Sequence, residues 1–439
     1  MTIKLPKAEP KRGERAVLIA LADGRPIGSI YQGGGGVLRF VYDGAWRNDA
    51  SAYPLSLSMP LTAAVHKHDA ITAFLWGLLP DNDRTLDRYG RLFGVSAGNP
   101  VALLAHIGAD CAGAVQLAPP EAAASLAGSA LGTPTVEWLS ASDVAQELRT
   151  VREQGIPGRD SRTLGQFSLA GAQPKLALFE ENGRWGRPRG RTPTNRILKP
   201  PTGEFRGFAE NEHMCLELAG ALGIGAVTSR VMRFRDEVVI VVERFDRIKQ
   251  GRVYRRIHQE DVCQALAVMP TGKYESDGGP GVAQTIALLR GASLRPQEDI
   301  ERFLQALALN WVLAATDAHA KNFALLHSRS GAGVRLAPFY DIVSFLPYAD
   351  AGLHRVKLAM KVGGEYLVRR ITRRHWEALA RSNALAPSYV QDNVSHVLQR
   401  VAAVIDTVTN RAIKDGLAER VVAALANRIR ARVKSLTNA

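Results

Sequence analysis

The stretch Leu309-Asn-Trp-Val-Leu-Ala-Ala-Thr-Asp-Ala-His-Ala-Lys-Asn-Phe323 joins an apolar run to a set of polar residues. The apolar run stops at Asp317, and Asn322 follows five residues later. A second acid, Asp341, ends the run Pro-Phe-Tyr-Asp. Phosphoryl transfer on magnesium needs a carboxylate to receive the nucleophile's proton, an amide oxygen as a metal ligand and a second carboxylate on the metals. These three side chains supply those groups.

Protein kinases present the same groups in the same order and with the same first spacing. The Asp-x4-Asn spacing alone is a weak signal because such pairs arise often by chance. An aspartate in a loop more commonly caps a helix or a turn. The second aspartate behind an aromatic pair makes the pattern more specific, and the rest of the chain has to support it.

The composition is that of an ordinary globular protein, with 46% hydrophobic and 22% charged residues, and the length allows two or three domains. Cys111, Cys215 and Cys263 lie far apart without a Cys-x-x-Cys motif, which suggests neither a zinc site nor a disulfide framework. No stretch approaches the roughly 18 uninterrupted apolar residues of a membrane span. We therefore expect a cytoplasmic protein without a membrane partner.

Basic residues exceed acidic ones, 56 against 42, which gives a formal net charge of +14. Such an excess favours contact with phosphates, on nucleic acid or on a nucleotide. It also fits a solvated basic surface, because much of it is spread along segments with helical periodicity.

The hydrophobic pattern changes from β-rich to helical near residue 257. The expected strands are 16–21, 25–31, 37–42, 114–118, 196–199 and 238–242. The expected helices are 72–80, 84–93, 141–153, 209–222, 259–268, 281–290, 297–315, 373–382, 387–411 and 415–436. This pattern predicts an α+β, two-lobed, protein-kinase-like fold with an added N-terminal subdomain and an all-α C-terminal lobe. The expected segments are a disordered basic tail (1–15), a β-rich N-terminal subdomain (16–120), a linker (121–135), the kinase N-lobe (136–256) and the helical C-lobe with the catalytic loop (257–439).

Three local patterns bear on a nucleotide site. Residues 166–179 predict a strand, a tight turn at Gly171 and a second strand. Glu212 lies in line with the apolar face of the expected helix 209–222, where a carboxylate is costly unless paired, and Lys199 is the candidate partner. Residues 33–36 are all glycine, and because no Lys-Ser/Thr or helix follows, they favour a hairpin loop over a phosphate cradle.

Seven motifs stand out along the chain. In order they are Pro54-Leu-Ser-Leu-Ser-Met-Pro-Leu, Leu79-Pro-Asp-Asn, Ser168-Leu-Ala-Gly-Ala-Gln-Pro-Lys, Val242-Glu-Arg-Phe-Asp-Arg, Tyr274-Glu-Ser-Asp-Gly-Gly-Pro-Gly, Ala315-Thr-Asp-Ala-His-Ala-Lys-Asn-Phe and Pro338-Phe-Tyr-Asp-Ile. Together they resemble the HipA family, whose members are serine/threonine kinases and the toxins of bacterial toxin–antitoxin pairs. The resemblance runs from about Ala16 to about Met360.

The resemblance implies a role for each matching residue. Asp317 would be the catalytic base, Asn322 and Asp341 the Mg2+ ligands, and Lys199 the lysine that holds the ATP phosphates. Ser168 would be the autophosphorylated serine. The remaining ATP-binding set comprises the loop residues Ala170, Gly171, Ala172 and Gln173, the hinge residues Glu243, Arg244 and Phe245, and His319 and Lys321. For His319 a buried side chain bonded to the loop backbone is the favoured alternative, and Lys321 could equally be a surface lysine.

The resemblance also implies an activity and partners. The chain would use ATP and Mg2+ to phosphorylate a protein, with an aminoacyl-tRNA synthetase, in particular the glutamyl enzyme, as the expected target. A small helix-turn-helix antitoxin dimer, similar to HipB, would inhibit it and place it on operator DNA. Two alternatives stay open: a transcriptional corepressor with weak or lost kinase activity, and a small-molecule kinase of the same fold.

Three positions depart from the family pattern. Ala318 stands where the motif has glycine, Pro174 stands where a polar residue is expected, and the segment 202–209, the counterpart of an activation loop, is short. Alanine does not favour a positive φ, so Ala318 raises the question of a local shift in the catalytic loop. None of the three departures removes a catalytic group.

Overall fold

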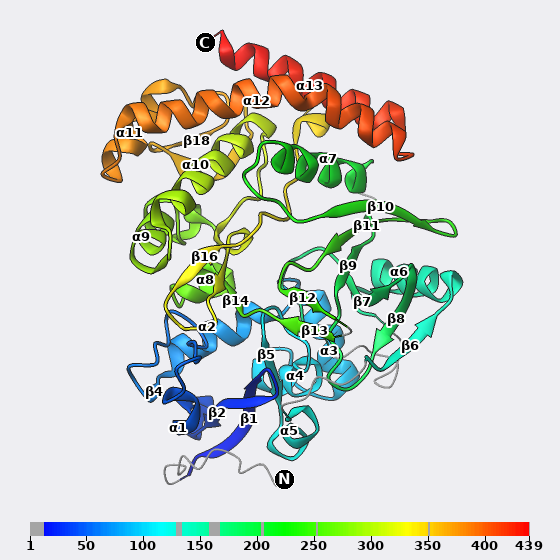
Figure 1. Ribbon diagram of the computed structural model, residues 1–439, viewed down its shortest axis with the longest axis vertical. Coiled ribbons are helices and arrows are strands. Elements are labelled where there is room, and N and C mark those ends of the chain that lie inside the picture. The colour runs from blue at the N-terminus through cyan, green and yellow to red at the C-terminus, as the bar shows by residue number, and fades with distance from the viewer. Residues whose placement is uncertain are drawn as a thin grey trace.

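The structure is a computed structural model that describes residues 13–128, 134–157, 167–202, 206–251, 253–349 and 352–438. Most of the expected tail, part of the expected linker, Gln166 and part of the short segment 202–209 lie outside the described residues. The N-terminal sheet lies at one end of the molecule, and the long helices α12 (Pro387–Lys414) and α13 (Glu419–Thr437) lie at the other (Figure 1).

The N-terminal subdomain is a five-stranded antiparallel sheet covered by helices. The strand order is β4-β3-β2-β1-β5. The strands are β1 (Arg15–Ala22), β2 (Arg25–Gln32), β3 (Leu38–Tyr42), β4 (Val65–His66) and β5 (Val115–Ala118); the helices are α1 (Gly44–Arg47), α2 (His68–Leu78), α3 (Asp83–Phe93) and α4 (Pro100–Ile107). The strands and helices expected here are confirmed, and residues 33–36 form the exposed connection between β2 and β3.

The linker prediction is only partly right. Residues 121–135 were expected to be a surface connection, but α5 (Pro120–Leu126) forms there, and Ala123 and Leu126 are buried in one cluster with Ile19 and Leu21 of β1. The run of small residues hid this helix, because alanine and serine give little hydrophobic contrast between its buried and exposed faces.

The second sheet has six strands in the order β10-β11-β9-β7-β8-β6. Its strands are β6 (Val136–Leu139), β7 (Leu176–Glu181), β8 (Arg184–Pro188), β9 (Arg196–Lys199), β10 (Ser229–Phe234) and β11 (Glu237–Glu243), and β12 (Arg247–Gln250) and β13 (Val253–Arg256) form a separate hairpin. Because side chains alternate along a strand, Val239 and Val241 of β11 pack with α6 (Ala141–Gln154), whereas Ile240 and Val242 pack with α7 (Phe208–Ala221). The sheet is therefore buried on both faces.

The strand expected before Gly171 does not form within the described residues. Phe167 and Gly171 instead make isolated parallel bridges to Asp110 and Pro80 of the N-terminal subdomain. The first regular strand after the turn is β7. The segment before the turn pairs with residues of the N-terminal subdomain that are distant in sequence, and the local hydrophobic pattern does not reveal such pairing.

The C-terminal lobe is mainly helical, with α9 (Val282–Ala292), α10 (Pro296–Leu313), α11 (Arg373–Ser382), α12 (Pro387–Lys414) and α13 (Glu419–Thr437). It is not all-α, because it also holds β14 (Gln259–Asp261), β15 (Ala324–His327) and β16 (Val334–Leu336) in one sheet and β17 (Lys357–Val362) and β18 (Glu365–Leu367) in another. The helix expected at 259–268 is replaced by β14 and the short α8 (Val262–Ala265). Short 3-10 segments cover Gly34–Gly36, Pro270–Gly272, Glu275–Asp277, Ala320–Asn322 and Leu346–Tyr348. Among the described residues no helix is both long and apolar enough to span a bilayer.

A buried ionic cluster joins the N-terminal subdomain to the β12–β13 hairpin and to the end of β11. Asp110, between α4 and β5, accepts hydrogen bonds from Arg247 at 2.9 Å and from Arg256 at 3.1 Å. Arg244 pairs with Asp246 at 2.7 Å in the same cluster. Burial alone would raise the pKa of Asp110, but the surrounding arginines lower it, so the carboxylate stays charged.

A second buried network joins the subdomain to the C-terminal lobe. Glu260 of β14 accepts from the backbone N–H of Leu57 at 2.8 Å and from the Ser56 hydroxyl at 2.5 Å. His327 of β15 contacts the same carboxylate at 2.8 Å. The motif at 54–61 thus fixes the subdomain against β14, which pairs with β15.

Candidate active site

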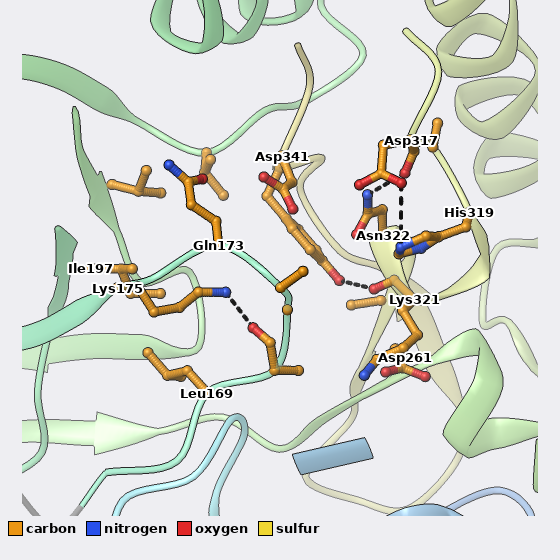
Figure 2. A pocket seen from close by; sticks show the side chains of 18 of the residues that line it. Leu169, Gln173, Lys175, Ile197, Asp261, Asp317, His319, Lys321, Asn322 and Asp341 are labelled. Atoms are coloured by element: carbon orange, nitrogen blue, oxygen red, sulfur yellow. Dashed lines mark hydrogen bonds and ion pairs between the residues drawn. The ribbon is translucent and has the colours of Figure 1, made fainter. Parts of the chain in front are cut away.

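A cavity of about 420 Å³ lies where the N-terminal subdomain, the second sheet and the C-terminal lobe meet. Its lining includes the loop 169–173, the segment 242–246, the loop 315–319 and Asp81 of the N-terminal subdomain. Figure 2 shows Gln173 and Lys175 on one side of the pocket and Asp317, His319 and Lys321 on the other. The structure therefore brings together residues that are far apart in the sequence.

The loop 315–323, which the sequence predicts to be the catalytic loop, leaves α10 through a left-handed cap and closes on itself. Ala314 has a φ of +50°, which ends the helix. The carbonyl of Asp317 accepts from the Asn322 side-chain amide at 2.7 Å and from the His319 backbone N–H at 2.8 Å. Ala318 does not have a positive φ. The alanine therefore fits this backbone without strain, which answers the question that the sequence left open.

The Asp317 side chain lies at the mouth of the cavity and is 65% exposed. The Tyr274 hydroxyl donates a hydrogen bond to its Oδ1 at 2.5 Å, and His319 Nε2 lies 3.9 Å from the same oxygen. Burial and this carboxylate raise the pKa of Tyr274. Asp317 is thus reachable from solvent and already accepts a hydrogen bond from a hydroxyl group, a geometry that suits a base for an alcohol acceptor.

Lys199, at the end of β9, forms the buried ion pair that the sequence predicts. Its ammonium lies 2.6 Å from Glu212 Oε1 of α7 and 2.8 Å from Asp341 Oδ1. Burial alone would lower the pKa of Lys199, but the two carboxylates raise it, so the lysine is firmly charged. Burial raises the pKa of the Glu212 carboxyl, and Lys199 opposes that effect. The two carboxylates thus hold the Lys199 ammonium in a fixed position at the cavity wall.

Asn322 and Asp341 offer oxygen ligands at the centre of the site (Figure 2). The Asn322 nitrogen is used by the Asp317 carbonyl, which leaves its side-chain oxygen as the group available to a cation. Asp341 has a φ of +59°, and Lys199 and Lys175 lower the pKa of its carboxyl against the effect of burial. Among the described residues no cluster of three His, Cys, Asp or Glu could hold a metal alone. Mg2+ in phosphotransferases typically takes one or two protein oxygens and completes its shell with phosphates and water, which this pair fits.

The loop Leu169–Gln173 lies opposite the catalytic loop. Gly171 has a φ of +109°, which strains any residue with a side chain, and a Cβ there would also meet the Lys175 ammonium, so glycine suits the position. The Lys175 ammonium donates to the Ala170 carbonyl, and Gln173 Nε2 donates to the Pro200 carbonyl at 3.4 Å. Burial, with Lys199 nearby, lowers the pKa of Lys175 to about 8. The expected loop residues all line the cavity.

The segment Glu243–Phe245 forms the far wall, although its three side chains differ in role. The backbone N–H groups of Glu243 and Arg244 bond to the Thr228 and Asn195 carbonyls. The Arg244 guanidinium belongs to the buried cluster with Asp246, whereas Phe245 stacks on Tyr340 with ring centroids 5.7 Å apart. Ile197, Val227 and Val242 also line the cavity, and their apolar side chains would suit a flat purine.

Two expectations for side chains in the catalytic loop need correction. His319 is buried, burial lowers its pKa, and its Nδ1 has no hydrogen-bond partner, so its ring does not bond the loop backbone as favoured. Lys321 is not a surface lysine, because its side chain is 3% exposed and its ammonium lies 2.5 Å from Asp81 Oδ1. Both residues line the cavity.

Several residues that shape the site received no role from the sequence. They are Asp81, Lys175, Asp261, Lys273 and Tyr274. Four of them stand within or beside the motifs at 79–82, 168–175 and 274–281, so a signal was present. The contacts of Asp81, Lys273 and Tyr274 were not readable, because each of these three side chains pairs with a residue from another part of the chain.

Ser168 is buried and lies beside the cavity loop, with its hydroxyl donating to the Leu78 carbonyl at 2.8 Å. The Ser168 backbone N–H donates to the Asp110 carbonyl at 3.1 Å. In this arrangement the hydroxyl is tied to the N-terminal subdomain, and a phosphate on it would require the loop to move.

Family models match both parts of the chain. A HipA N-terminal domain matches residues 18–118, and a HipA-like C-terminal domain matches residues 167–409. Y4mE of Sinorhizobium fredii, provisionally named a kinase, is 34% identical over 388 residues, which cover 88% of this chain and 90% of Y4mE. The serine/threonine-protein kinase toxin HipA of Shewanella oneidensis is 29% identical over 371 residues, 82% of this chain and 81% of that toxin.

A solved structure agrees with the sequence relatives. The HipA chain from the Shewanella oneidensis MR-1 complex of HipA, HipB and operator DNA matches with a TM-score of 0.81 and 25% identity, covering 96% of this chain and 97% of that one. The shared fold includes the sheets and the helical C-terminal region described above. The chain therefore belongs to the HipA family.

Proposed function

We propose that this protein is an ATP-dependent serine/threonine protein kinase that acts as the toxin of a toxin–antitoxin pair. The observation that carries the proposal is the single cavity in which Lys199, Asp317, Asn322 and Asp341 converge. These are the groups that phosphoryl transfer requires, and each is held by contacts that fix its orientation. The kinase-like relatives support the same activity.

ATP would bind with its base against the 243–245 wall and its phosphates toward the loop Leu169–Gln173. Lys199 would hold the phosphates with a charge that Glu212 keeps in place. Mg2+, held by Asn322 and Asp341, would neutralise charge on the phosphates. Asp341 would then exchange part of its contact with Lys199 for the cation.

Asp317 would orient the acceptor hydroxyl and receive its proton as the γ-phosphoryl group moves in line to the acceptor oxygen. In the free protein the Tyr274 hydroxyl donates to Asp317 in the place that the substrate hydroxyl would take, so the substrate would displace it. Catalysis in such a site comes mainly from positioning and charge neutralisation, because the transition state is loose.

The proposed substrate and partners rest on the resemblance to the HipA family. We propose that the target is an aminoacyl-tRNA synthetase, in particular the glutamyl enzyme, and that a small helix-turn-helix antitoxin dimer inhibits the kinase and links it to operator DNA. The Shewanella oneidensis relative is known in complex with HipB and operator DNA, which supports the partner.

Incubation with radioactive ATP and Mg2+ tests the activity. A labelled protein band, absent for an Asp317→Ala variant, is the expected result, and phosphoproteomics after induction of both proteins would identify the target. Label in a metabolite alone would favour a small-molecule kinase. ATP turnover unchanged by Asp317→Ala, with operator binding retained, would favour a corepressor.

The affinity for Mg-ATP should weaken as the pH rises through about 8, because Lys175 then loses its charge. A charged ammonium favours phosphate binding, so the protonated form is the tighter binder. We expect a several-fold rise in Kd between about pH 7 and about pH 9 by calorimetry, and a much flatter profile for Lys175→Met. Lys249→Met, at an exposed lysine outside the cavity, is the control. A Lys175→Met profile as steep as that of the wild type would contradict this assignment.

Ser168 is expected to become phosphorylated when the protein is incubated with Mg-ATP. Its hydroxyl is buried against Leu78, so the phosphorylated form would release the 167–173 segment and lower ATP affinity. Mass spectrometry should find the phosphate on Ser168 of the wild type and on neither Asp317→Ala nor Ser168→Ala. An active wild type that carries no phosphate at Ser168 would exclude this regulation.

A further inference from the structure

Asp81 connects the N-terminal subdomain to the catalytic loop. It follows Pro80 in the connection between α2 and α3, and its side chain is 6% exposed. Its carboxylate contacts two lysines of the C-terminal lobe, Lys321 at 2.5 Å and Lys273 at 3.0 Å. Burial would raise the pKa of this carboxyl, but the two lysines lower it, so Asp81 stays charged.

Lys321 stands in the loop between the base and the metal ligand, directly before Asn322. Its carbonyl accepts a hydrogen bond from the Tyr340 hydroxyl at 2.8 Å, and Tyr340 directly precedes Asp341. A displacement of Lys321 would therefore move Asn322, its neighbour in sequence. Through the Tyr340 hydrogen bond it would also move Asp341, the second proposed Mg2+ ligand. Figure 2 shows Lys321 on the same side of the pocket as Asp317 and Asn322.

The same connection also touches the opposite side of the cavity. The Asp81 backbone N–H donates to the Gly171 carbonyl at 3.2 Å, and Pro80 forms a parallel bridge with Gly171. The Leu78 carbonyl accepts from the Ser168 hydroxyl. One short segment of the N-terminal subdomain thus contacts both the phosphate-binding loop and the catalytic loop.

We propose that Asp81 is a positioning residue for phosphoryl transfer. Its carboxylate sets the position of the catalytic loop through Lys321, while its backbone sets the phosphate-binding loop through Gly171. The inference rests on the proposed kinase function and adds that the N-terminal subdomain aligns the two loops. A carboxylate shared by two lysines also leaves a net positive charge beside the cavity, which suits anionic phosphates.

The kinetic test compares Asp81→Asn with Asp83→Asn, a matched control at an exposed acid in the first turn of α3. We expect Asp81→Asn to lower kcat by about tenfold or more while KM for ATP changes by less than about threefold, because a small misplacement of reacting groups costs rate more than binding. Asp83→Asn should match the wild type. A wild-type kcat for Asp81→Asn would overturn the proposal.

A double-mutant cycle tests the route through Lys321. In a Lys321→Met background, Asp81→Asn should lower kcat by less than about twofold further, because the two side chains act as one unit. Losses that multiply independently would show that Asp81 acts by another route and would overturn this assignment.

Hydrogen exchange gives a readout that needs no turnover. Asp81→Asn should speed exchange in the segments 315–323 and 167–175 compared with Asp83→Asn, while α12 exchanges as in the wild type. Unchanged exchange in both loops would overturn the inference. If the wild type showed no Asp317-dependent labelling, the proposed function would fail, and hydrogen exchange would still decide whether Asp81 holds the two loops.

Discussion

Replacing Asp317 with asparagine is expected to lower the rate of phosphoryl transfer about a thousandfold. Asparagine keeps the shape of the side chain and an acceptor oxygen for the Tyr274 hydroxyl, but it cannot receive the acceptor's proton. The loop should stay intact, because its hydrogen bonds from Asn322 and His319 go to the Asp317 backbone carbonyl, which the substitution keeps. Label transfer from ATP to protein measures the rate.

Two controls isolate the chemical step. The Kd of Asp317→Asn for Mg-ATP should stay within about threefold of the wild type, because the exposed carboxylate is not in contact with the lysines that are proposed to hold the phosphates. Asp277→Asn, at an exposed acid three residues beyond Tyr274, should keep the wild-type rate. An Asp317→Asn variant with most of the wild-type rate would remove Asp317 from the base role.

Replacing Lys199 with methionine is expected to destabilise the fold and abolish ATP binding together. Glu212 is fully buried and would lose its counter-ion, and breaking a buried ion pair typically costs about 3–5 kcal/mol in the free energy of unfolding. The double variant Lys199→Met with Glu212→Gln removes the orphaned charge and should recover most of the stability. Neither variant should bind Mg-ATP. Urea midpoints and calorimetry measure the two effects.

The pH dependence gives an internal check on this prediction. Burial already raises the Glu212 pKa, and loss of Lys199 would raise it further. A carboxyl with a raised folded-state pKa destabilises the fold at high pH, and the deficit falls as the pH drops and the group protonates. The Lys199→Met deficit should therefore shrink between about pH 8 and about pH 5, and the double variant should not show this change. An equal deficit at both pH values would contradict the paired state of Glu212.

The exposed pair Lys249–Glu181 serves as the matched control. Its atoms lie 3.0 Å apart on the surface, where solvent screens the attraction. Lys249→Met should leave the urea midpoint unchanged. A comparable loss of stability there would mean that the Lys199 effect does not come from burial.

Much of the site was readable from the sequence because its residues sit in short motifs with fixed spacing. The five-residue spacing from Asp317 to Asn322 matches that of the base and the metal ligand in kinases. Glu212 lies on an apolar helix face, where a carboxylate needs a cationic partner. The Lys199–Glu212 pair is confirmed, with 2.6 Å between Lys199 Nζ and Glu212 Oε1. The prediction was possible because a buried carboxylate requires a cation, and Lys199 on the nearby strand is one. Most helices were also predictable, because their periodicity is local.

The secondary-structure predictions that were wrong concern segments whose structure depends on contacts distant in sequence. The expected helix at 259–268 became β14 because its backbone pairs with β15, more than sixty residues later. The same holds for Phe167 and Gly171, whose bridges run to the N-terminal subdomain. Strand pairing of this kind leaves only a weak trace in local hydrophobic periodicity.

The sequence by itself supplied an acid, an amide and a second acid in the order found in kinases, and the other motifs along the chain made that weak pattern specific. Only the tertiary structure decided how they are held. Asp81 meets Lys321 across 240 residues of sequence, and its backbone meets Gly171 in the loop opposite. Charge pairing at that separation depends on the packing of three parts of the chain around one cavity, because an ion pair becomes specific only when burial excludes water from it.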